Sequence, residues 1–78
     1  MKDLENKIVN RLKELDFNED HCIGTLTLLD ENNREDNYKK MYEFLQNDKL
    51  TADSRSDIIE YAFKVSGVKK EHYIIVSE

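Results

Sequence analysis

The stretch KDLENKIVNRLKELDF, residues 2–17, has the most regular hydrophobic spacing in this sequence. Charged and amide side chains fill most positions between apolar residues that recur at spacings of four, four and three: Leu4, Ile8, Leu12 and Leu15. Such spacing places the apolar side chains on one face of a helix. The sequence therefore predicts a helix over residues 2–15, with Phe17 turned inward after it.

A second helix is predicted to run from the polar break after Leu15 to about Asp30. Either Asp16 or Asn18 can cap its N-terminus. Its apolar stripe is taken as Cys22, Ile23, Leu26 and Leu29, with Leu28 beside it. Threonine and isoleucine in this run also favour strands. We prefer a helix because two acids start the segment and no hairpin partner follows it.

Two further helices follow in the sequence. A stripe of Tyr38, Met41, Tyr42 and Leu45 predicts a helix over about residues 34–47, capped by Asn32 or Asn33. Another stripe of Ile58, Tyr61, Ala62 and Val65 predicts a helix that is capped by Thr51 or Ser54. This last helix is expected to end at Gly67, the residue type preferred just after a helix C-terminus.

The C-terminal residues differ from the rest of the chain. Their apolar, β-prone run is Tyr73, Ile74, Ile75 and Val76. A single strand is not stable alone. The segment 68–78 is therefore expected to pack on the helices as an extended arm, to add a helical turn, or to pair with a second chain. In the last case the four residues of the run are the candidate homodimer contacts.

The predicted fold class is all-α: a compact bundle of three to four short helices over residues 1–67, with a short extended C-terminal arm over residues 68–78. Short connections between the helices favour antiparallel neighbours. The predicted core contains Leu4, Ile8, Leu12, Leu15, Phe17, Ile23, Leu26, Leu29, Tyr38, Met41, Tyr42, Leu45, Ile58, Ala62 and Val65.

Length and composition limit the class of protein. The chain has 78 residues, which suits one domain, and charged residues make up 37% of it. No apolar run approaches the roughly 20 residues that cross a bilayer, and the N-terminus lacks the apolar stretch of a secretory signal. Cys22 is the only cysteine, so no internal disulfide can form. A reducing cytoplasmic location is the simplest interpretation.

No catalytic, metal or cofactor site is recognisable in the sequence. An EF-hand loop starting at Asp30 would place Arg34, Glu35 and Met41 at positions that require an oxygen ligand, a glycine and a glutamate. The two glycines, Gly24 and Gly67, are too far apart for a phosphate-binding loop. We therefore expect no enzyme activity, no cofactor and no metal.

The net charge of −5 is concentrated in residues 18–36, which contain six acidic residues and one arginine. Acidic surfaces repel phosphate backbones and attract basic partners. The leading prediction is a small protein-interaction or regulatory module with an acidic face that docks on a protein with a basic surface. The residues of this predicted face are Glu19, Asp20, Glu31, Glu35 and Asp36.

An alternative is a nucleic-acid-binding regulator with a helix-turn-helix-like pair at about residues 34–66. Its cations would be Arg55, Lys64, Lys69 and Lys70. The expected recognition helix also carries Asp53, Asp57 and Glu60, whose negative charges would repel the phosphates on either side of a DNA groove. Nucleic acid is therefore the less favoured partner.

Residues 8–45 resemble ubiquitin-associated domains in the order of their helices and breaks. The pattern consists of Ile8-Val9-x-x-Leu12-x-x-Leu15, then Asp16-Phe17, then helices ending in Leu28-Leu29 and Phe44-Leu45. The family has a Gly-Phe loop, and Asp16 stands here in place of the glycine. Any small three-helix domain can share these residue types, so the resemblance identifies no family.

Overall fold

The computed structural model describes residues 2–68. Its helices are α1 (Lys2–Glu14), α2 (Glu19–Leu29), α3 (Arg34–Leu45) and α4 (Arg55–Ser66), with the 3-10 turn η1 (Ala52–Ser54) before α4. All regular structure within residues 2–68 is helical, which confirms the predicted all-α bundle. The predicted C-terminal arm lies, from residue 69 onward, outside the described residues.

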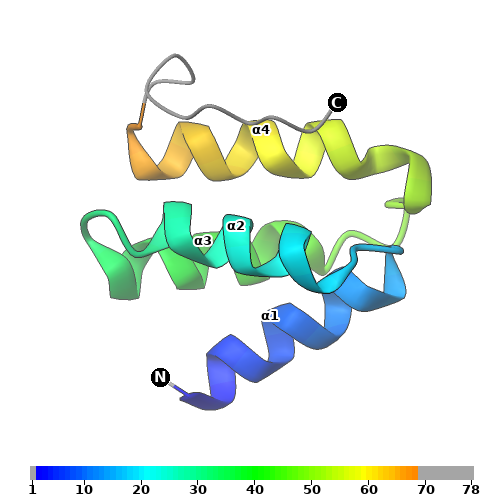
Figure 1. Ribbon diagram of the computed structural model, residues 1–78, viewed down its shortest axis with the longest axis horizontal. Helices are drawn as coiled ribbons and strands as arrows, with labels where there is room; N and C mark the ends of the chain where they lie inside the picture. Colours follow the sequence, from blue (N-terminus) through cyan, green and yellow to red (C-terminus); the bar gives the residue numbers. More distant parts are fainter. Residues whose placement is uncertain (1, 69–78) are drawn as a thin grey trace.

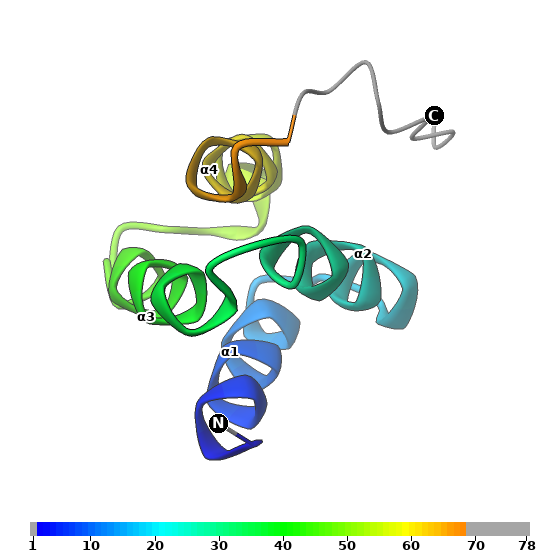
Figure 2. The ribbon, with the colours of Figure 1, turned by 90° about the vertical axis from the view of Figure 1, so that its left-hand side faces the viewer.

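The helices form three layers (Figures 1 and 2). Helices α2 and α3 lie side by side in the middle, with α1 on one side of the pair and α4 on the other. Helix α1 packs mainly against α3, while α4 packs against both α2 and α3. The chain reverses direction from α2 to α3 and again from α3 to α4, as the short connections predict.

The core lies where the three layers meet, and most of the predicted core residues are buried there. Leu4, Leu26, Tyr42 and Val65 are partly buried and pack against its edge. The buried members of the prediction are Ile8, Leu12, Leu15, Phe17, Leu29, Tyr38, Met41, Leu45, Ile58 and Ala62.

The predicted stripe of α2 is wrong at Ile23, which is 56% exposed. The buried face of α2 consists of Cys22, Thr25, Leu28 and Leu29, so the helix is rotated from the predicted orientation. Thr25 can face the core because its hydroxyl donates to the carbonyl of His21 at 2.8 Å within the same helix. The polar atom is thereby satisfied, and Ile23 is left in solvent.

A similar, smaller correction applies to α4. Phe63 and Ser66 are buried, whereas the predicted Tyr61 and Val65 are only partly buried. The Ser66 hydroxyl donates to the carbonyl of Phe63 at 3.1 Å and accepts from the amide of Val68 at 3.3 Å. Because both bonds are made locally, this serine costs little to bury.

Helix α1 ends in a Schellman motif. The amide of Asp16 donates to the carbonyl of Lys13, and the amide of Phe17 donates to the carbonyl of Leu12, both at 3.0 Å. Asp16 takes the left-handed backbone conformation of this motif, with φ of 71°. The reversal turns Phe17 into the core as predicted, and Asn18 then caps α2 by accepting from the amide of His21 at 2.8 Å.

We expect Asp16→Gly to raise the free energy of unfolding by about 0.5 kcal/mol. Glycine adopts positive φ without the steric cost that a Cβ brings, and this gain exceeds the extra freedom of glycine in the unfolded chain. Asp16→Ala should lower stability by a similar amount, because alanine keeps the Cβ and loses the short polar side chain. Urea unfolding of both variants checks the prediction, and equal midpoints would contradict it.

The other helix ends differ slightly from their predicted positions. Helices α1, α2 and α3 end one or two residues earlier than expected. Asn33 occupies the N-cap position of α3 as predicted, with φ of 45°, but its side chain makes no capping hydrogen bond. Gly67 ends α4 as predicted, with φ of 76° and its amide donating to the carbonyl of Phe63.

Candidate functional site

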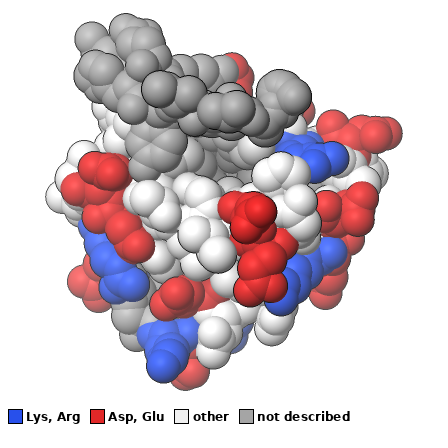
Figure 3. Space-filling view, in the orientation of Figure 1, with Lys and Arg blue, Asp and Glu red and all other residues white. Residues whose placement is uncertain are grey.

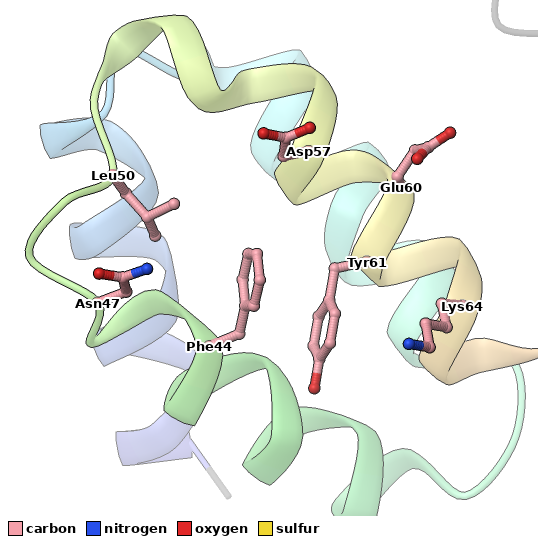
Figure 4. Close-up of a pocket in the computed structure, with 7 residues that line it drawn as sticks. All are labelled: Phe44, Asn47, Leu50, Asp57, Glu60, Tyr61 and Lys64. Atoms are coloured by element: carbon pink, nitrogen blue, oxygen red, sulfur yellow. The ribbon is translucent and has the colours of Figure 1, made fainter.

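A shallow groove of about 470 Å³ runs between α3 and α4. We call it the α3–α4 groove, and Figure 4 shows the side chains around it. The rings of Phe44, near the end of α3, and Tyr61, on α4, stack with centroids 4.2 Å apart and an interplanar angle of 8°. The groove is lined by Phe44, Asn47, Leu50, Asp57, Glu60, Tyr61 and Lys64.

The apolar floor of the groove extends the core to the surface. Phe44, Leu50 and Tyr61 are partly buried and pack against the core cluster. Phe44 directly precedes the buried Leu45, so it projects from the flank of α3 and not from its buried stripe. The stacked pair contributes about 0.5–1.5 kcal/mol beyond the area it buries. Part of each ring stays open to solvent, which gives an apolar segment a surface to contact.

Arginine 11 on α1 holds one wall of this groove in place. Nε of Arg11 donates to the carbonyl of Leu45 at 2.8 Å, and its Nη2 donates to the carbonyl of Asn47 at 3.1 Å. Its remaining Nη1 pairs with Glu14 at 3.1 Å. The cation therefore satisfies the carbonyl of Leu45, which the end of α3 leaves without an intrahelical partner, and also bonds to the connection that follows α3. The bonds to Leu45 and Asn47 therefore fix the segment from Phe44 to Asn47 relative to α1.

The rim of the groove is charged on the α4 side. Asp57, Glu60 and Lys64 are exposed and follow one another along α4 (Figure 4). Asp57 lies in the first turn of the helix, where the helix dipole favours a carboxylate. Within residues 2–68, Asp57 forms no ion pair. The groove thus has two carboxylates, Asp57 and Glu60, along the first part of α4 and the ammonium group of Lys64 toward its end.

A second shallow cavity, of about 430 Å³, lies at the start of α3 and is lined by polar and charged residues only. Its charges are largely internal to the fold. Arg34 bonds to Asp30 at 2.5 Å and lies 3.9 Å from Glu5 of α1. Lys40 pairs with Asp36 at 3.2 Å. This arrangement ties the start of α3 to its neighbours, while the lining residues Glu35 and Lys39 form no ion pair within residues 2–68.

Tyr38 forms the buried part of that network. Its ring is fully buried, and its hydroxyl donates to Oδ1 of Asp30 at 2.9 Å. The guanidinium of Arg34 lies 4.9 Å from the ring centroid. Burial first, and then the hydrogen bond to Asp30, raise the pKa of Tyr38 well above its usual value. The same Asp30 carboxylate raises the pKa of Arg34, so both groups are held in their protonated forms.

This shift predicts an alkaline loss of stability. Because the folded state holds the Tyr38 proton more tightly than the unfolded chain, stability is unaffected below the unfolded pKa of about 10. Above that pH, it should fall by about 1 kcal/mol per pH unit. Urea unfolding between pH 8 and 11 measures this fall. The Tyr38→Phe variant should show a shallower fall, and parallel curves for the two proteins would contradict the assignment.

The residues of the predicted acidic face are all exposed, but they lie in two groups. Glu19 and Asp20 occupy the first turn of α2, and the others lie beyond its opposite end. The 11 residues of α2 separate the groups by about 16 Å. Red and blue side chains are interspersed on the face shown in Figure 3. The structure brings Glu31, Glu35 and Asp36 together near the start of α3, where Asp36 is already paired with Lys40.

The helices of the nucleic-acid alternative are α3 and α4. Residues 46–54 connect them, whereas a helix-turn-helix has a turn of about three or four residues. Nη1 of Arg55 lies 3.3 Å from Nδ1 of His21, so this candidate cation is directed at α2. Lys64 shares its helix with Asp57 and Glu60 on the groove rim. Lys69 and Lys70 lie outside the described residues, as do the candidate dimer contacts Tyr73 to Val76.

Reactive and metal-binding groups form no site in the described part of the chain. Cys22 is buried, and this burial raises the pKa of its thiol. Over residues 2–68, no three His, Cys, Asp or Glu side chains are placed to hold a metal ion. The helices of the same range include none that is long and apolar enough to cross a membrane.

Phe44 and Leu50 were not predicted from the sequence as site residues. One signal was available, because Phe44 is a large aromatic residue outside the apolar stripe of its own helix. Its partner Tyr61 was predicted to lie on the apolar stripe of its own helix. Their pairing depends on how α3 and α4 pack, and periodicity within one helix contains no such information.

Comparison with models of known protein families, with curated proteins and with solved structures finds no match for this chain.

Proposed function

We propose that this chain is a small protein-interaction domain, without enzyme activity, whose α3–α4 groove binds a short segment of a protein partner. The stacked pair of Phe44 and Tyr61 at the open floor of the groove carries the proposal. Aromatic residues with one polar end are enriched at protein interfaces, because they supply apolar contact area at low entropic cost. A reducing cytoplasmic location suits a domain with one buried, unpaired cysteine.

The chemistry of the groove defines the partner segment. Its floor favours large aliphatic or aromatic side chains, and the exposed carboxylate of Asp57 favours a lysine or arginine beside them. The net charge of −5 attracts basic segments over longer distances. The partner is therefore a basic protein segment with an apolar centre, which agrees with the basic partner expected from the sequence.

Selection from a random peptide library displayed on phage tests this proposal. Peptides that pair large apolar residues with lysine or arginine should be enriched. Their affinity should fall at least about tenfold for Tyr61→Ala, the loss of about 1.4 kcal/mol expected for a central interface residue. The matched control is Ile23→Ala, which removes an exposed apolar side chain from α2. Circular dichroism verifies that both variants are folded.

A second pair of variants tests the charge without altering the floor of the groove. Asp57→Asn should weaken the same peptides and reduce the salt dependence of binding. Asp53→Asn is the control, because Asp53 is an exposed acid in η1 that does not line the groove. Equal affinities for all four variants and the unaltered chain would rule the groove out.

The predicted acidic residues are tested with the same peptides. Reversal of Glu31 and Glu35 to lysine should leave binding to the groove nearly unchanged, since both residues lie near the start of α3. If this variant loses peptide binding while Tyr61→Ala retains it, the partner binds at the acidic residues predicted from the sequence and not in the groove.

A further inference from the structure

We infer that the α3–α4 groove binds the C-terminal segment, residues 69–78, of a second copy of this chain, so that two copies contact each other reciprocally. The inference rests on the proposed function, because it gives an occupant to the same groove. It connects an apolar surface in the described residues with an apolar run in the sequence that follows them.

The chemistry of the segment matches the groove. Lys69 and Lys70, followed by Glu71 and His72, precede the four large apolar residues Tyr73 to Val76. Along α4 the groove offers the carboxylate of Asp57 at one end, then the carboxylate of Glu60 and the ring of Tyr61 about one helical turn further on. A basic pair followed by apolar side chains therefore has both a charged and an apolar counterpart in this groove.

The position of Val68 shows where the segment starts. The amide of Val68 donates to the hydroxyl of Ser66 at 3.3 Å, and its side chain packs against the core. The carbonyl of Ser66 accepts from Nδ2 of Asn32 at 3.0 Å, which holds the end of α4 against the α2–α3 connection. Residue 69 thus follows directly from the C-terminal end of α4.

A segment that starts there fits the groove of its own chain poorly. It would enter at the Lys64 end, which places Lys69 and Lys70 beside another lysine and away from Asp57. Tyr73 to Val76, if extended, lie about 16–26 Å along the chain from Val68. Tyr61 lies only about 7.5 Å along α4 from Ser66. The apolar run would therefore pass beyond the stacked rings.

A segment from a second copy is free of both restrictions. It can enter the groove from the Asp57 end, so that the two lysines meet the carboxylate and the apolar run reaches Phe44 and Tyr61. The groove of the second copy can receive the first copy's segment in the same way. Such a symmetric exchange closes at two chains and leaves neither groove empty.

The oligomeric state of the full chain tests the inference. Sedimentation velocity should show a dimer whose population falls on dilution, with a dissociation constant on the order of micromolar. The groove variant Tyr61→Ala and the segment variant Ile74→Asp with Ile75→Asp should each sediment as monomers. Monomeric sedimentation of the unaltered chain up to about 1 mM would overturn the inference.

Mixing the two monomeric variants distinguishes exchange between chains from docking within one chain. The segment variant retains an intact groove, and the groove variant retains an intact segment, so together they can form one of the two contacts. Adding the unlabelled groove variant to the ¹⁵N-labelled segment variant should shift the amide resonances of residues lining the groove. The reverse labelling should leave the resonances of the altered groove unchanged, and absence of shifts in both mixtures would contradict the exchange.

Reversing the charges of the segment, and then that of the groove, gives an independent test. Lys69→Glu with Lys70→Glu should weaken the dimer at least tenfold, and adding Asp57→Lys to the same chain should restore much of it. If dimerisation does not depend on these charges, the proposed orientation is contradicted.

If the chain is monomeric but peptides from the library bind the groove, this inference fails and the proposed function stands. If Tyr61→Ala changes neither dimerisation nor peptide binding, both fail.

Discussion

Replacing Asn37 with aspartate should lower the free energy of unfolding by about 3–5 kcal/mol at pH 7. Asn37 is buried, and its Nδ2 donates to the carbonyls of Leu29, at 3.2 Å, and Asn32, at 2.5 Å. A carboxylate at this position can only accept hydrogen bonds, so it would face two carbonyl oxygens with no donor. Since a domain of this size has about 3–5 kcal/mol of net stability, most of the variant should be unfolded.

The loss should be smaller at acidic pH. Burial raises the folded-state pKa of the new carboxyl group, so the folded variant binds a proton more tightly than the unfolded chain. The variant should therefore regain stability relative to the unaltered protein as the pH falls from 7 toward the unfolded value of about 3.9. The folded fraction of both proteins at pH 7 and pH 4, measured by circular dichroism without denaturant, gives this difference.

The Asn33→Asp variant is the matched control for this change. Asn33 is exposed at the N-terminus of α3, and its side chain makes no capping hydrogen bond. A carboxylate there interacts favourably with the helix dipole, so stability should change by less than about 0.5 kcal/mol. Equal losses in the two variants would show that Asn37 does not hold the α2–α3 connection through its amide.

The Leu29→Ala variant should lose about 2–5 kcal/mol of stability. Leu29 is fully buried on α2, so its truncation removes apolar contacts and leaves a cavity at the centre of the bundle. Ile23→Ala removes the same kind of side chain from the same helix, but Ile23 is 56% exposed. Its loss should be less than about 0.5 kcal/mol, and the better helix propensity of alanine can offset it.

Thermal unfolding of these two variants measures the orientation of α2 directly. The sequence alone predicted that both side chains are buried, and hence that both truncations are costly. The structure predicts one large loss and one small one. Comparable losses would restore the orientation expected from the sequence and remove Thr25 from the core.

Most of the fold could be predicted because each helix carries its own signal. Leu4, Ile8, Leu12 and Leu15 determine the buried face of α1 without reference to any other element. The orientation of α2 could not be obtained in this way, because its residues Ile23 to Leu29 include apolar side chains on nearly every face. Packing against the other helices, mainly α4, selects among those faces, and Thr25 can be buried because its hydroxyl is satisfied locally.

The candidate site was harder to predict for a related reason. Phe44 and Tyr61 come from separate helices, and their stacking follows from the tertiary packing of α3 against α4. The acids that drew attention in the sequence are instead close to basic side chains, as with Asp36 and Lys40, or lie at opposite ends of α2. Charge counted along a chain does not show which charges the fold pairs.

The hydrogen bonds of Arg11 extend the influence of the groove to a helix that does not line it. They join α1 to the carbonyls of Leu45 and Asn47 across 34 and 36 residues of sequence. Local opening of α1 must release those carbonyls and loosen the segment between Phe44 and Asn47. Occupation of the groove should therefore slow amide hydrogen exchange in α1 as well as in α3 and α4. The exchange rates of amides in the N-terminal helix should therefore show whether the groove is occupied.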